Sequence, residues 1–419
     1  MRQTIKGGRS ELLAAIDVGS SKVCCLIARR GHDGRPRVFG IGQQVNHGLR
    51  GGAVTDVDAT ETAIVNAVHA AEQMAGQRID RVVVNLSGGH PASTSVGVEV
   101  AIAGHAVGDS DLRRALEQGH RVGLNGAMNG NLRQLIHSIP VGYRIDGDRG
   151  IADPRGLFGE RLGVNVHFVT ASTGAVRNLM ACVERCHLEV EDLVVSPYAS
   201  GLASLVDDEM SLGVTVIDMG GGTTTIAVFL EGSVIYTDVL RVGGNHVTSD
   251  IARGLSTTLS HAERIKTLYG HAMTVGADEL IEVPQVGEEG DGEIQQIPRS
   301  LLVGIVQPRL EETFELVRSH LEASGMDKIS GRRVVLTGGA CQLPGIRDLA
   351  HLILDKQIRI GRPVRVSGLA EATSGPAYAT AAGLLVFAAT AERVSTRLAK
   401  EEASGRWLDR LGTWFREHL

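Results

Sequence analysis

Two short segments of the chain combine an aspartate, glycine and hydroxyl residues at the same spacing. The first reads IDVGSSKVCCLI from Ile16, and the second reads IDMGGGTTTIAV from Ile217. In each, the aspartate ends an apolar run, a glycine follows two positions later, and a polar turn leads into a second apolar run. Glycine lets a ligand approach the backbone, and the N–H groups of such turns suit the oxygens of a phosphate chain. The pair therefore predicts a site for a phosphate-bearing ligand.

These two turns supply the donors that a phosphate chain needs. They are Gly19, Ser20, Ser21, Lys22, Gly220, Gly221, Gly222, Thr223 and Thr224. Asp17 and Asp218 could hold a Mg²⁺ ion through its waters, because this hard cation keeps part of its hydration shell. A third glycine pair, Gly338 and Gly339, follows an apolar run and would let a nucleoside pass close to the backbone. Each motif alone also fits an ordinary tight turn, but the three in this order predict a nucleotide site.

The elements around the first two motifs predict one unit that occurs twice. Apolar runs at 12–16 and 23–28, and again at 214–217 and 226–230, predict two tight β-hairpins. A related pair, one in each half of the chain, indicates an internal duplication of two α/β units. The further helices and strands alternate, which predicts sheets covered by helices. Strands are expected at 81–86, 193–196 and 334–336, and helices at 58–74 (with an Asp58–Glu61 capping box), 172–187, 197–206, 310–321 and 376–389.

Two stretches interrupt this alternation. Residues 87–167 combine strands at 94–102 and 135–145 with a short helix capped by Asp109-Ser110-Asp111, and predict a small α+β insert. A second insert is expected at 247–308, with a helix at 260–269 and an acidic loop at 288–293 that is typical of a solvated turn.

Composition excludes several classes of protein. The chain carries 42 Lys and Arg against 48 Asp and Glu, a formal charge of −6, which argues against a general nucleic-acid binder. It has no run of about 18 apolar residues and no signal-peptide core at its N-terminus. The five cysteines form no disulfide framework, and the scattered histidines predict no metal site. Cys24, Cys25, Cys182 and Cys186 are expected in the core. A cytosolic protein is the prediction.

The last residues, RWLDRLGTWFREHL, predict an amphipathic helix after a charged linker at 391–404. On a helix, its large apolar side chains share one face with arginines beside it, which is the composition of a helix that lies in a membrane interface. The expected membrane-binding residues are Trp407, Leu408, Leu411, Trp414, Phe415, Arg406 and Arg410. The alternative is a helix that docks on its own domain. So short a helix binds lipid weakly alone, so firm attachment would need several copies on one polymer.

The three glycine motifs in this order resemble those of the actin-like ATPase superfamily, and within it the chain is most similar to the FtsA family of bacterial cell-division proteins. Further resemblances lie in 196–203 and 376–383, like two connecting helices, in the adenosine loop 336–345, and in 261–266. The resemblance covers about residues 11–390 and the tail. It implies an actin-like (ribonuclease H-like) α/β fold with duplicated domains and an inserted α+β domain.

The resemblance also implies a site and a division of the chain. Glu263 and Lys266 would approach the adenine and ribose of ATP, with Mg²⁺ beside the phosphates. Chaperone relatives have a glutamate where this chain has Ser196, so weak or no ATPase activity is expected. The expected parts are a leader at 1–10, subdomain 1A at 11–86 and 168–200, insert 1C at 87–167, subdomain 2A at 201–246 and 309–390, 2B at 247–308, the linker at 391–404 and the membrane-targeting helix at 405–419.

By the same resemblance, the chain would self-associate into filaments on the cytoplasmic side of the membrane at the division site. It would anchor the ring of FtsZ, whose C-terminal peptide would dock on 2B, and recruit downstream division proteins. The alternative is a sugar or acid kinase of the same fold, for which no catalytic aspartate stands out. A component of a pilus or rod-shape system is a third possibility, which the inserted domain and the terminal helix suit less well.

Overall fold

A computed structural model of the 419-residue chain describes residues 12–127, 132–274, 279–286 and 294–390. The predicted leader, the acidic loop at 288–293, the charged linker and the terminal helix lie outside these ranges. The predictions made for them, including all seven membrane-binding residues from Arg406 to Phe415, therefore stay predictions.

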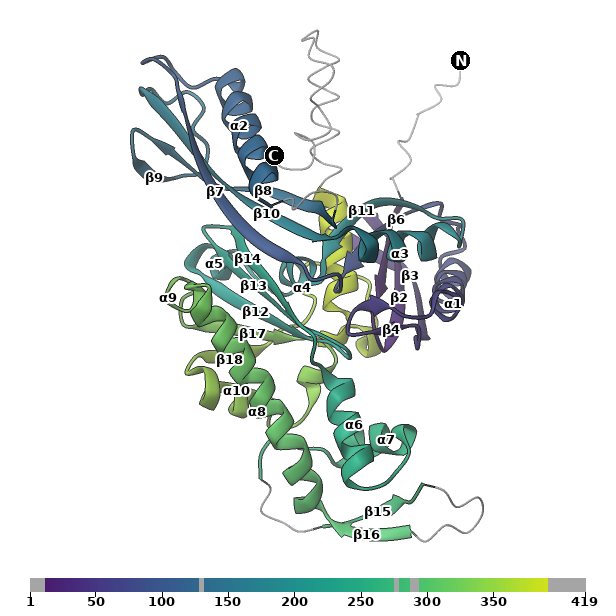
Figure 1. Ribbon diagram of the computed structural model, residues 1–419. Coiled ribbons are helices and arrows are strands. Elements are labelled where there is room, and N and C mark those ends of the chain that lie inside the picture. The colour runs from purple at the N-terminus through teal and green to yellow at the C-terminus, as the bar shows by residue number, and fades with distance from the viewer. Residues whose placement is uncertain (1–11, 128–131, 275–278, 287–293, 391–419) are drawn as a thin grey trace, which may run out of the picture.

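The first predicted hairpin is confirmed and lies inside a five-stranded sheet (Figure 1). The strand order is β3-β2-β1-β6-β11; β1 to β3 are antiparallel, while β6 and β11 run parallel to β1. The strands are β1 (Leu12–Val18), β2 (Lys22–Arg30), β3 (Pro36–Val45), β6 (Arg81–Leu86) and β11 (Glu189–Val195).

The second predicted hairpin is confirmed in a sheet of the same plan. Its order is β14-β13-β12-β17-β18, again with an antiparallel half and two strands parallel to the first of the hairpin. Matching order and direction confirm the internal duplication. The strands are β12 (Val214–Met219), β13 (Thr224–Leu230), β14 (Ser233–Leu240), β17 (Arg333–Thr337) and β18 (Gln357–Ile360).

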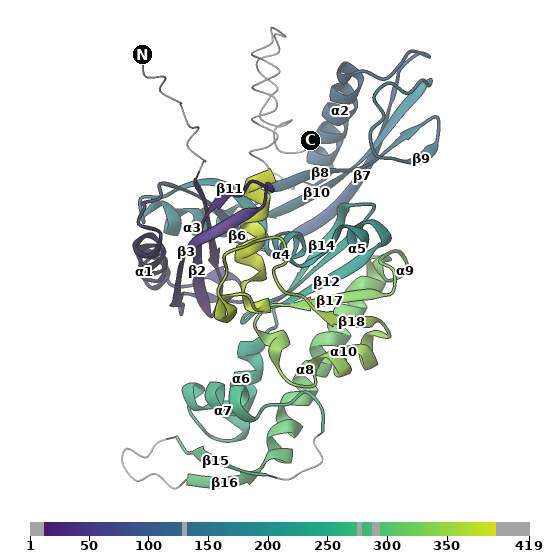
Figure 2. The same ribbon diagram turned by 180° about the vertical axis from the view of Figure 1, so that it is seen from behind.

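Helices cover the outer face of each sheet, as the alternating pattern predicted (Figures 1 and 2). On the first sheet they are α1 (Val57–Ala75) and α3 (Thr173–Glu184), and on the second α8 (Arg299–Ala323) and α10 (Ile346–Leu354). The predicted capping box of α1 is wrong by two residues. Asp56 is the N-cap, and its carboxylate accepts a hydrogen bond from the Ala59 amide at 3.0 Å, whereas Asp58 lies in the first turn.

The long helix α8 corrects a second prediction, that a helix begins only after Pro308. Pro308 lies inside α8, where its missing N–H leaves the Gly304 carbonyl without its usual donor. The apolar stripe nevertheless continues across the proline, with Val306 and Leu310 buried in the same core. Burial of this stripe on the second sheet outweighs the lost hydrogen bond, so the helix runs through.

Two helices fill the space between the sheets. One is α4 (Ser196–Ser204), which begins with Pro197 in its first turn, and the other spans 379–390 and follows the 3₁₀ turn η4 (Pro376–Tyr378). The helix at 379–390 packs on the inner face of the first sheet, while Tyr198 of α4 packs against Phe229 of β13 on the second. At Gly383 a Cβ would overlap the Ala199 carbonyl, so a glycine is needed where the two helices cross.

The first insert forms a separate four-stranded sheet with one helix, seen at one end of the molecule in Figure 1. Its order is β7-β10-β8-β9, and α2 packs on β10 and β7. The predicted short helix is in fact 19 residues long, and β10 was not predicted. The elements are β7 (Ala92–Ala101), α2 (Asp109–Ala127), β8 (Arg133–Ile145), β9 (Asp148–Ile151) and β10 (Arg161–Ser172).

A fully buried histidine joins this insert to the second sheet. The His167 ring lies 2.5 Å from the Ser93 hydroxyl through Nε2 and 3.0 Å from the Val234 carbonyl of β14 through Nδ1. Burial lowers the pKa of His167 to about 4, so the ring is neutral, with one nitrogen as donor and the other as acceptor. The insert is therefore fixed to the β14 edge by a directional contact.

The second insert lies at the opposite end from the first (Figure 1). Its described elements are α6 (Gly244–Gly254), α7 (Leu259–Tyr269), β15 (Leu280–Pro284) and β16 (Ile294–Pro298). The remaining short elements are β4 (Leu49–Arg50), β5 (Ala53–Val54), α5 (Asp207–Leu212), α9 (Met326–Ile329), η2 (Ala340–Gln342) and η3 (Glu371–Thr373). Within the described ranges, no helix is both long and apolar enough to cross a bilayer.

Of the four cysteines predicted for the core, Cys24, Cys25 and Cys182 are buried. All five are free thiols, and four are buried, with Cys186 half-buried. Burial raises the pKa of Cys24 to about 12 and that of Cys186 to about 11, so neither is a thiolate at neutral pH.

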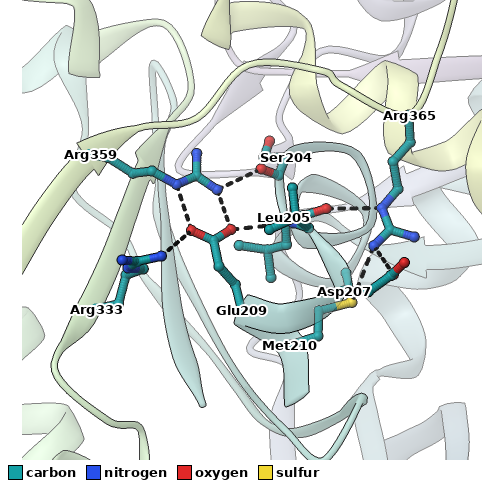
Figure 3. Close-up of polar contacts among 9 residues, drawn as sticks. Ser204, Leu205, Asp207, Glu209, Met210, Arg333, Arg359 and Arg365 are labelled. Carbon is teal, nitrogen blue, oxygen red and sulfur yellow. Dashed lines mark hydrogen bonds and ion pairs between the residues drawn. The ribbon is translucent and has the colours of Figure 1, made fainter. Parts of the chain in front are cut away.

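A buried carboxylate at the start of α5 ties the connection after α4 to the second sheet (Figure 3). The Glu209 side chain is only 3% exposed and accepts hydrogen bonds from the Arg359 guanidinium (Nε at 2.7 Å) and from the Val206 amide at 3.2 Å. Burial by itself would raise the pKa of Glu209, but the arginine and the amide outweigh it, and the pKa is lowered. Arg359 also donates to the Ser204 carbonyl at 2.9 Å.

We predict that Glu209→Gln lowers the free energy of unfolding by about 2–4 kcal/mol at pH 7, because it leaves Arg359 without its anion. A carboxyl with a lowered pKa stabilises the fold above its ordinary pKa, and this contribution is lost as the pH falls through the folded-state value. Urea unfolding at several pH values should therefore show the difference shrinking in acid. As a control, Glu315→Gln in the exposed pair with Arg318 should change stability by less than about 1 kcal/mol. A Glu209→Gln effect no larger than this control would contradict the prediction.

Candidate functional site

A cavity of about 500 Å³ lies between the two duplicated units, and the predicted motifs meet in it. The predicted residues that line it are Asp17, Gly19, Ser20, Ser21, Lys22, Asp218, Gly220, Gly221, Gly222, Thr223, Glu263, Lys266, Gly338 and Gly339. The volume is in the range of about 300–1,000 Å³ that small-molecule sites have. Segments more than three hundred positions apart in the sequence thus form a single concave surface.

The two hairpin turns have the same internal geometry. The Gly19 amide donates to the Lys22 carbonyl at 2.9 Å, and the Gly220 amide donates to the Thr223 carbonyl at 2.8 Å. The duplication therefore extends from the sheet topology to the hydrogen bond that closes each turn. The two turns touch one another at the cavity, since a Cβ at Gly221 would overlap the Ser21 hydroxyl. The same hydroxyl donates to the side chain of Asn245, at the start of α6, at 3.0 Å.

Two aspartates at the ends of equivalent strands give the cavity its negative charge. Burial, assisted by the charge of Asp218, raises the pKa of Asp17 to about 7, although Lys22 opposes the shift. Burial also raises the pKa of Asp218, although its carboxylate accepts hydrogen bonds from Ser200 and, at 2.8 Å, from Thr380. Two carboxylates in one poorly solvated site favour either a proton or a cation between them.

The third glycine motif needs glycine for two reasons. Gly338 has φ +86°, a conformation that other residues rarely adopt, and a Cβ there would overlap an oxygen of Asp218 and the Met219 carbonyl. The backbone of the second unit therefore passes directly against the carboxylate.

The second insert supplies one wall of the cavity, and Glu263 and Lys266 of α7 lie in that wall. Lys266 Nζ lies 2.7 Å from the Glu263 carboxylate and donates to the Thr248 hydroxyl at 2.9 Å and to the Gly244 carbonyl at 3.2 Å. The pair is one helical turn apart, so both side chains leave the same face of α7. It presents one anionic and one cationic group in fixed positions.

Thr224 differs from the prediction. Its buried hydroxyl donates to the Val242 carbonyl at 2.8 Å, and the residue does not line the cavity. Side chains alternate along a strand, so Thr223 and Thr225 point into the cavity while Thr224 points away. The hydroxyl of Thr225 is buried and has no hydrogen-bond partner among the described residues. A buried hydroxyl without a partner is the kind of group that a ligand oxygen or a hydrated ion completes.

Sequence reasoning missed several lining residues, of which Thr225 belongs to the second glycine motif and the others lie outside the two hairpin turns. They include Asn85, Ser87, Thr225, Asn245, Gln342 and Thr380. Asn85 accepts from the Val18 amide at 2.6 Å and donates to the Ser196 hydroxyl at 3.1 Å, so it links the first hairpin to the start of α4. An asparagine at the end of the apolar strand 81–86 was the signal available for it.

This set of groups suits a polyphosphate with a hard cation. Backbone amides and hydroxyls of the turns can bind phosphate oxygens, and Lys22 adds a positive charge. Within the described residues, no three His, Cys, Asp or Glu side chains gather as a metal site. A Mg²⁺ ion at Asp17 and Asp218 would therefore take its other ligands from water and from the phosphates, as this ion commonly does.

Comparisons with known proteins agree on the family. A family profile described as "Cell division protein FtsA" matches residues 215–383, and one described as "SHS2 domain inserted in FTSA" matches residues 88–170. The chain is 44% identical to the cell division protein FtsA of Agrobacterium fabrum, over 98% of this chain and 95% of that protein. It is 33% identical to the FtsA of Escherichia coli, over 99% of this chain and 100% of that protein.

Solved structures show the actin-like fold. The described architecture is similar to the PilM-PilN type IV pilus biogenesis complex (TM-score 0.65, 19% identity, covering 90% of this chain and 98% of that one). It is also similar to the MamK double helical filament (TM-score 0.52, 12% identity, covering 90% and 98%). At these identities the likeness concerns the fold alone.

We predict that Asp17→Asn stabilises the chain at pH 8 when Mg²⁺ and nucleotide are absent. A carboxyl whose pKa is raised in the folded state holds its proton more tightly there, so stability falls as the pH rises from about 4 to 7. The gain should be about 1–3 kcal/mol at pH 8, a figure reduced because Asp17 is partly exposed, and should disappear near pH 4. Urea unfolding at pH 4, 6 and 8 measures it.

The control for this prediction is Asp148→Asn, since Asp148 is exposed on β9. Its effect should be small and the same at each pH. A pH-independent gain for Asp17→Asn would show that the gain does not come from the ionised carboxylate.

Proposed function

The chain belongs to the FtsA family of cell division proteins, and from this premise we propose that it is an ATP-binding division protein that assembles into filaments on the inner face of the cytoplasmic membrane. There it anchors the FtsZ ring through its C-terminal amphipathic helix and recruits later division proteins. The observation that carries the nucleotide part is the cavity in which both hairpin turns, two aspartates and the third glycine pair meet.

In this proposal, each predicted residue that lines the cavity has a role. The turns at 19–22 and 220–223 hold the phosphates, Asp17 and Asp218 hold Mg²⁺ through water, and Gly338 and Gly339 admit the nucleoside. Glu263 and Lys266 contact the ribose and the adenine edge. The Thr225 hydroxyl supports an oxygen-rich occupant, because it is buried beside Asp218 without a partner among the described residues.

The same geometry supports slow hydrolysis. Ser196 lines the cavity, and its hydroxyl accepts a hydrogen bond from Asn85 at 3.1 Å. A serine and an amide are much weaker bases than a carboxylate, and a positioned general base contributes about 10²–10⁴ to a rate. The carboxylates that line the cavity are Asp17, Asp218 and Glu263, and the first two would hold the cation while the third pairs with Lys266. ATP would then act mainly as a switching or structural ligand.

Membrane and partner binding rest on other parts of the chain. The proposal places membrane attachment in the tail, whose tryptophans and arginines suit a lipid interface, and FtsZ binding in 2B at 247–308. Filament formation would multiply weak tail contacts into firm attachment. The kinase alternative has no observation in its favour once the family is known.

We predict that Asp218→Asn removes most of the Mg²⁺ dependence of ATP binding. Wild type should bind ATP more tightly with Mg²⁺ than with EDTA, since the aspartates hold the ion, whereas the variant should show a ratio reduced by about 10-fold or more. Calorimetric titration in both buffers measures this. Asp148→Asn should keep the wild-type ratio. An undiminished ratio in Asp218→Asn would contradict the assignment of this aspartate.

We predict that the tail is required for lipid binding. Full-length protein should co-sediment with anionic liposomes in the presence of ATP, while a chain that ends at Ser404 should stay in solution. Replacing both tryptophans, Trp407→Ala with Trp414→Ala, should weaken binding at least about tenfold because it removes a large apolar area from the interface. Thr413→Ser on the polar face is the matched control. If full-length and shortened chains both stay in solution, the tail is a docking helix instead.

A further inference from the structure

We propose that Tyr378 is a positioning residue that holds the ammonium group of Lys22 at the wall of the cavity, ready for the phosphates of a nucleotide. The inference rests on the proposed nucleotide function and adds to it a residue that belongs to none of the glycine motifs. Tyr378 closes the 3₁₀ turn η4, which leads into the helix at 379–390.

The contact is a close cation–π interaction. Lys22 Nζ lies 3.7 Å from the centre of the Tyr378 ring, well inside the distance of about 6 Å over which a ring attracts a cation. Lys22 lines the cavity, as does Ala377, the neighbour of the tyrosine. Lys22 is half-buried, and so is Tyr378, so water screens the interaction only in part.

A ring suits this lysine better than a carboxylate would. A lysine side chain has many rotamers, and fixing one before a ligand arrives reduces the entropy lost on binding. A carboxylate partner would fix the side chain but would also neutralise the charge. No carboxylate in the described part of the chain forms an ion pair with Lys22. The ring therefore orders the ammonium group and leaves its charge available for an anionic ligand.

The ring is itself held from the first unit. The Tyr378 hydroxyl donates to the Gln43 side chain at 2.6 Å, and Gln43 of β3 pairs with Cys24 of β2. Cys24 and Lys22 are two positions apart on one strand, so they and Gln43 share one face of the sheet. The ring is thus fixed beside the lysine by the strand next to it.

The segment that carries the ring is held from the second unit. The Pro376 carbonyl accepts from the Gly338 amide at 3.2 Å, and the Thr380 hydroxyl donates to Asp218 at 2.8 Å. Residues 376–380 therefore contact the third glycine motif and the second carboxylate on one side, and Lys22 and Gln43 on the other. The position of the phosphate lysine depends on both halves of the cavity.

The experiment compares Tyr378→Leu with Tyr378→Phe in the full-length chain, using ATP, ADP and adenosine as ligands with Mg²⁺ present. Tyr378→Leu should weaken ATP and ADP binding about 5- to 30-fold, the range that a partly desolvated cation–π contact supplies. Adenosine binding should stay within about twofold, because adenosine has no phosphate for Lys22 to bind. Tyr378→Phe keeps the ring and should retain most of the ATP affinity.

A double-mutant cycle distinguishes loss of the Lys22 contact from a general packing defect. In a Lys22→Ala chain, Tyr378→Leu should cause no further loss of ATP affinity, since the ring then has no cation to position. Tyr236→Leu is the matched control, because Tyr236 bonds Asp238 on β14 and does not line the cavity.

Three results would overturn the proposal. They are equal losses for ATP and adenosine in Tyr378→Leu, an unchanged or stronger ATP affinity, and a full loss in the Lys22→Ala background. Failure of the proposed function itself is separate and visible at the start, because wild type would then bind neither ATP nor ADP.

Discussion

The crossing of two helices between the sheets is the constraint on which the cavity depends. At Ala199 and Gly383 the backbone of α4 and that of the helix at 379–390 come so close that no side chain fits between them. This approach brings Ser200 of one helix and Thr380 of the other to the same carboxylate, Asp218. Because small residues let the two helices pack closely, side chains from both units line one cavity.

Electrostatics in the cavity follow from that burial. Asp17 and Asp218 lie at equivalent strand ends in a region whose burial raises the pKa of each. Two ionised carboxylates side by side are unfavourable there, and a bound cation or proton lowers their electrostatic energy. Lys22 adds positive charge at the wall without pairing with either carboxylate, because its ammonium lies over the Tyr378 ring. The Lys22 ammonium would therefore be free to bind a phosphate, and the two aspartates would be free to bind a metal ion.

The two inserts are joined to this centre differently. The first packs along β14 through the buried His167, which contacts Ser93 and the Val234 carbonyl, so it meets the second unit as a fixed body. The second supplies cavity residues directly, through Glu263 and Lys266 of α7. A ligand in the cavity would therefore touch the second insert itself, but would reach the first only through the sheet of the second unit. The two ends of the molecule would therefore respond differently to a ligand in the cavity.

The sequence by itself determined the features whose signals are local. The two Asp-Gly hairpins, the duplication, several of the strands and the family resemblance all follow from patterns within a dozen residues, where turn chemistry and side-chain alternation act directly. Local signals failed where packing decided the outcome. A helix was predicted to begin only after Pro308, but a continuous buried stripe carries α8 through the proline, and Thr224 turns its hydroxyl to Val242. The Asp58 cap was wrong for a local reason, because Asp56 two residues earlier binds the Ala59 amide. Only the tertiary structure placed Asn85 and Thr380 at the cavity and Tyr378 against Lys22. Their roles depend on contacts between segments more than a hundred residues apart, and no local pattern encodes such contacts.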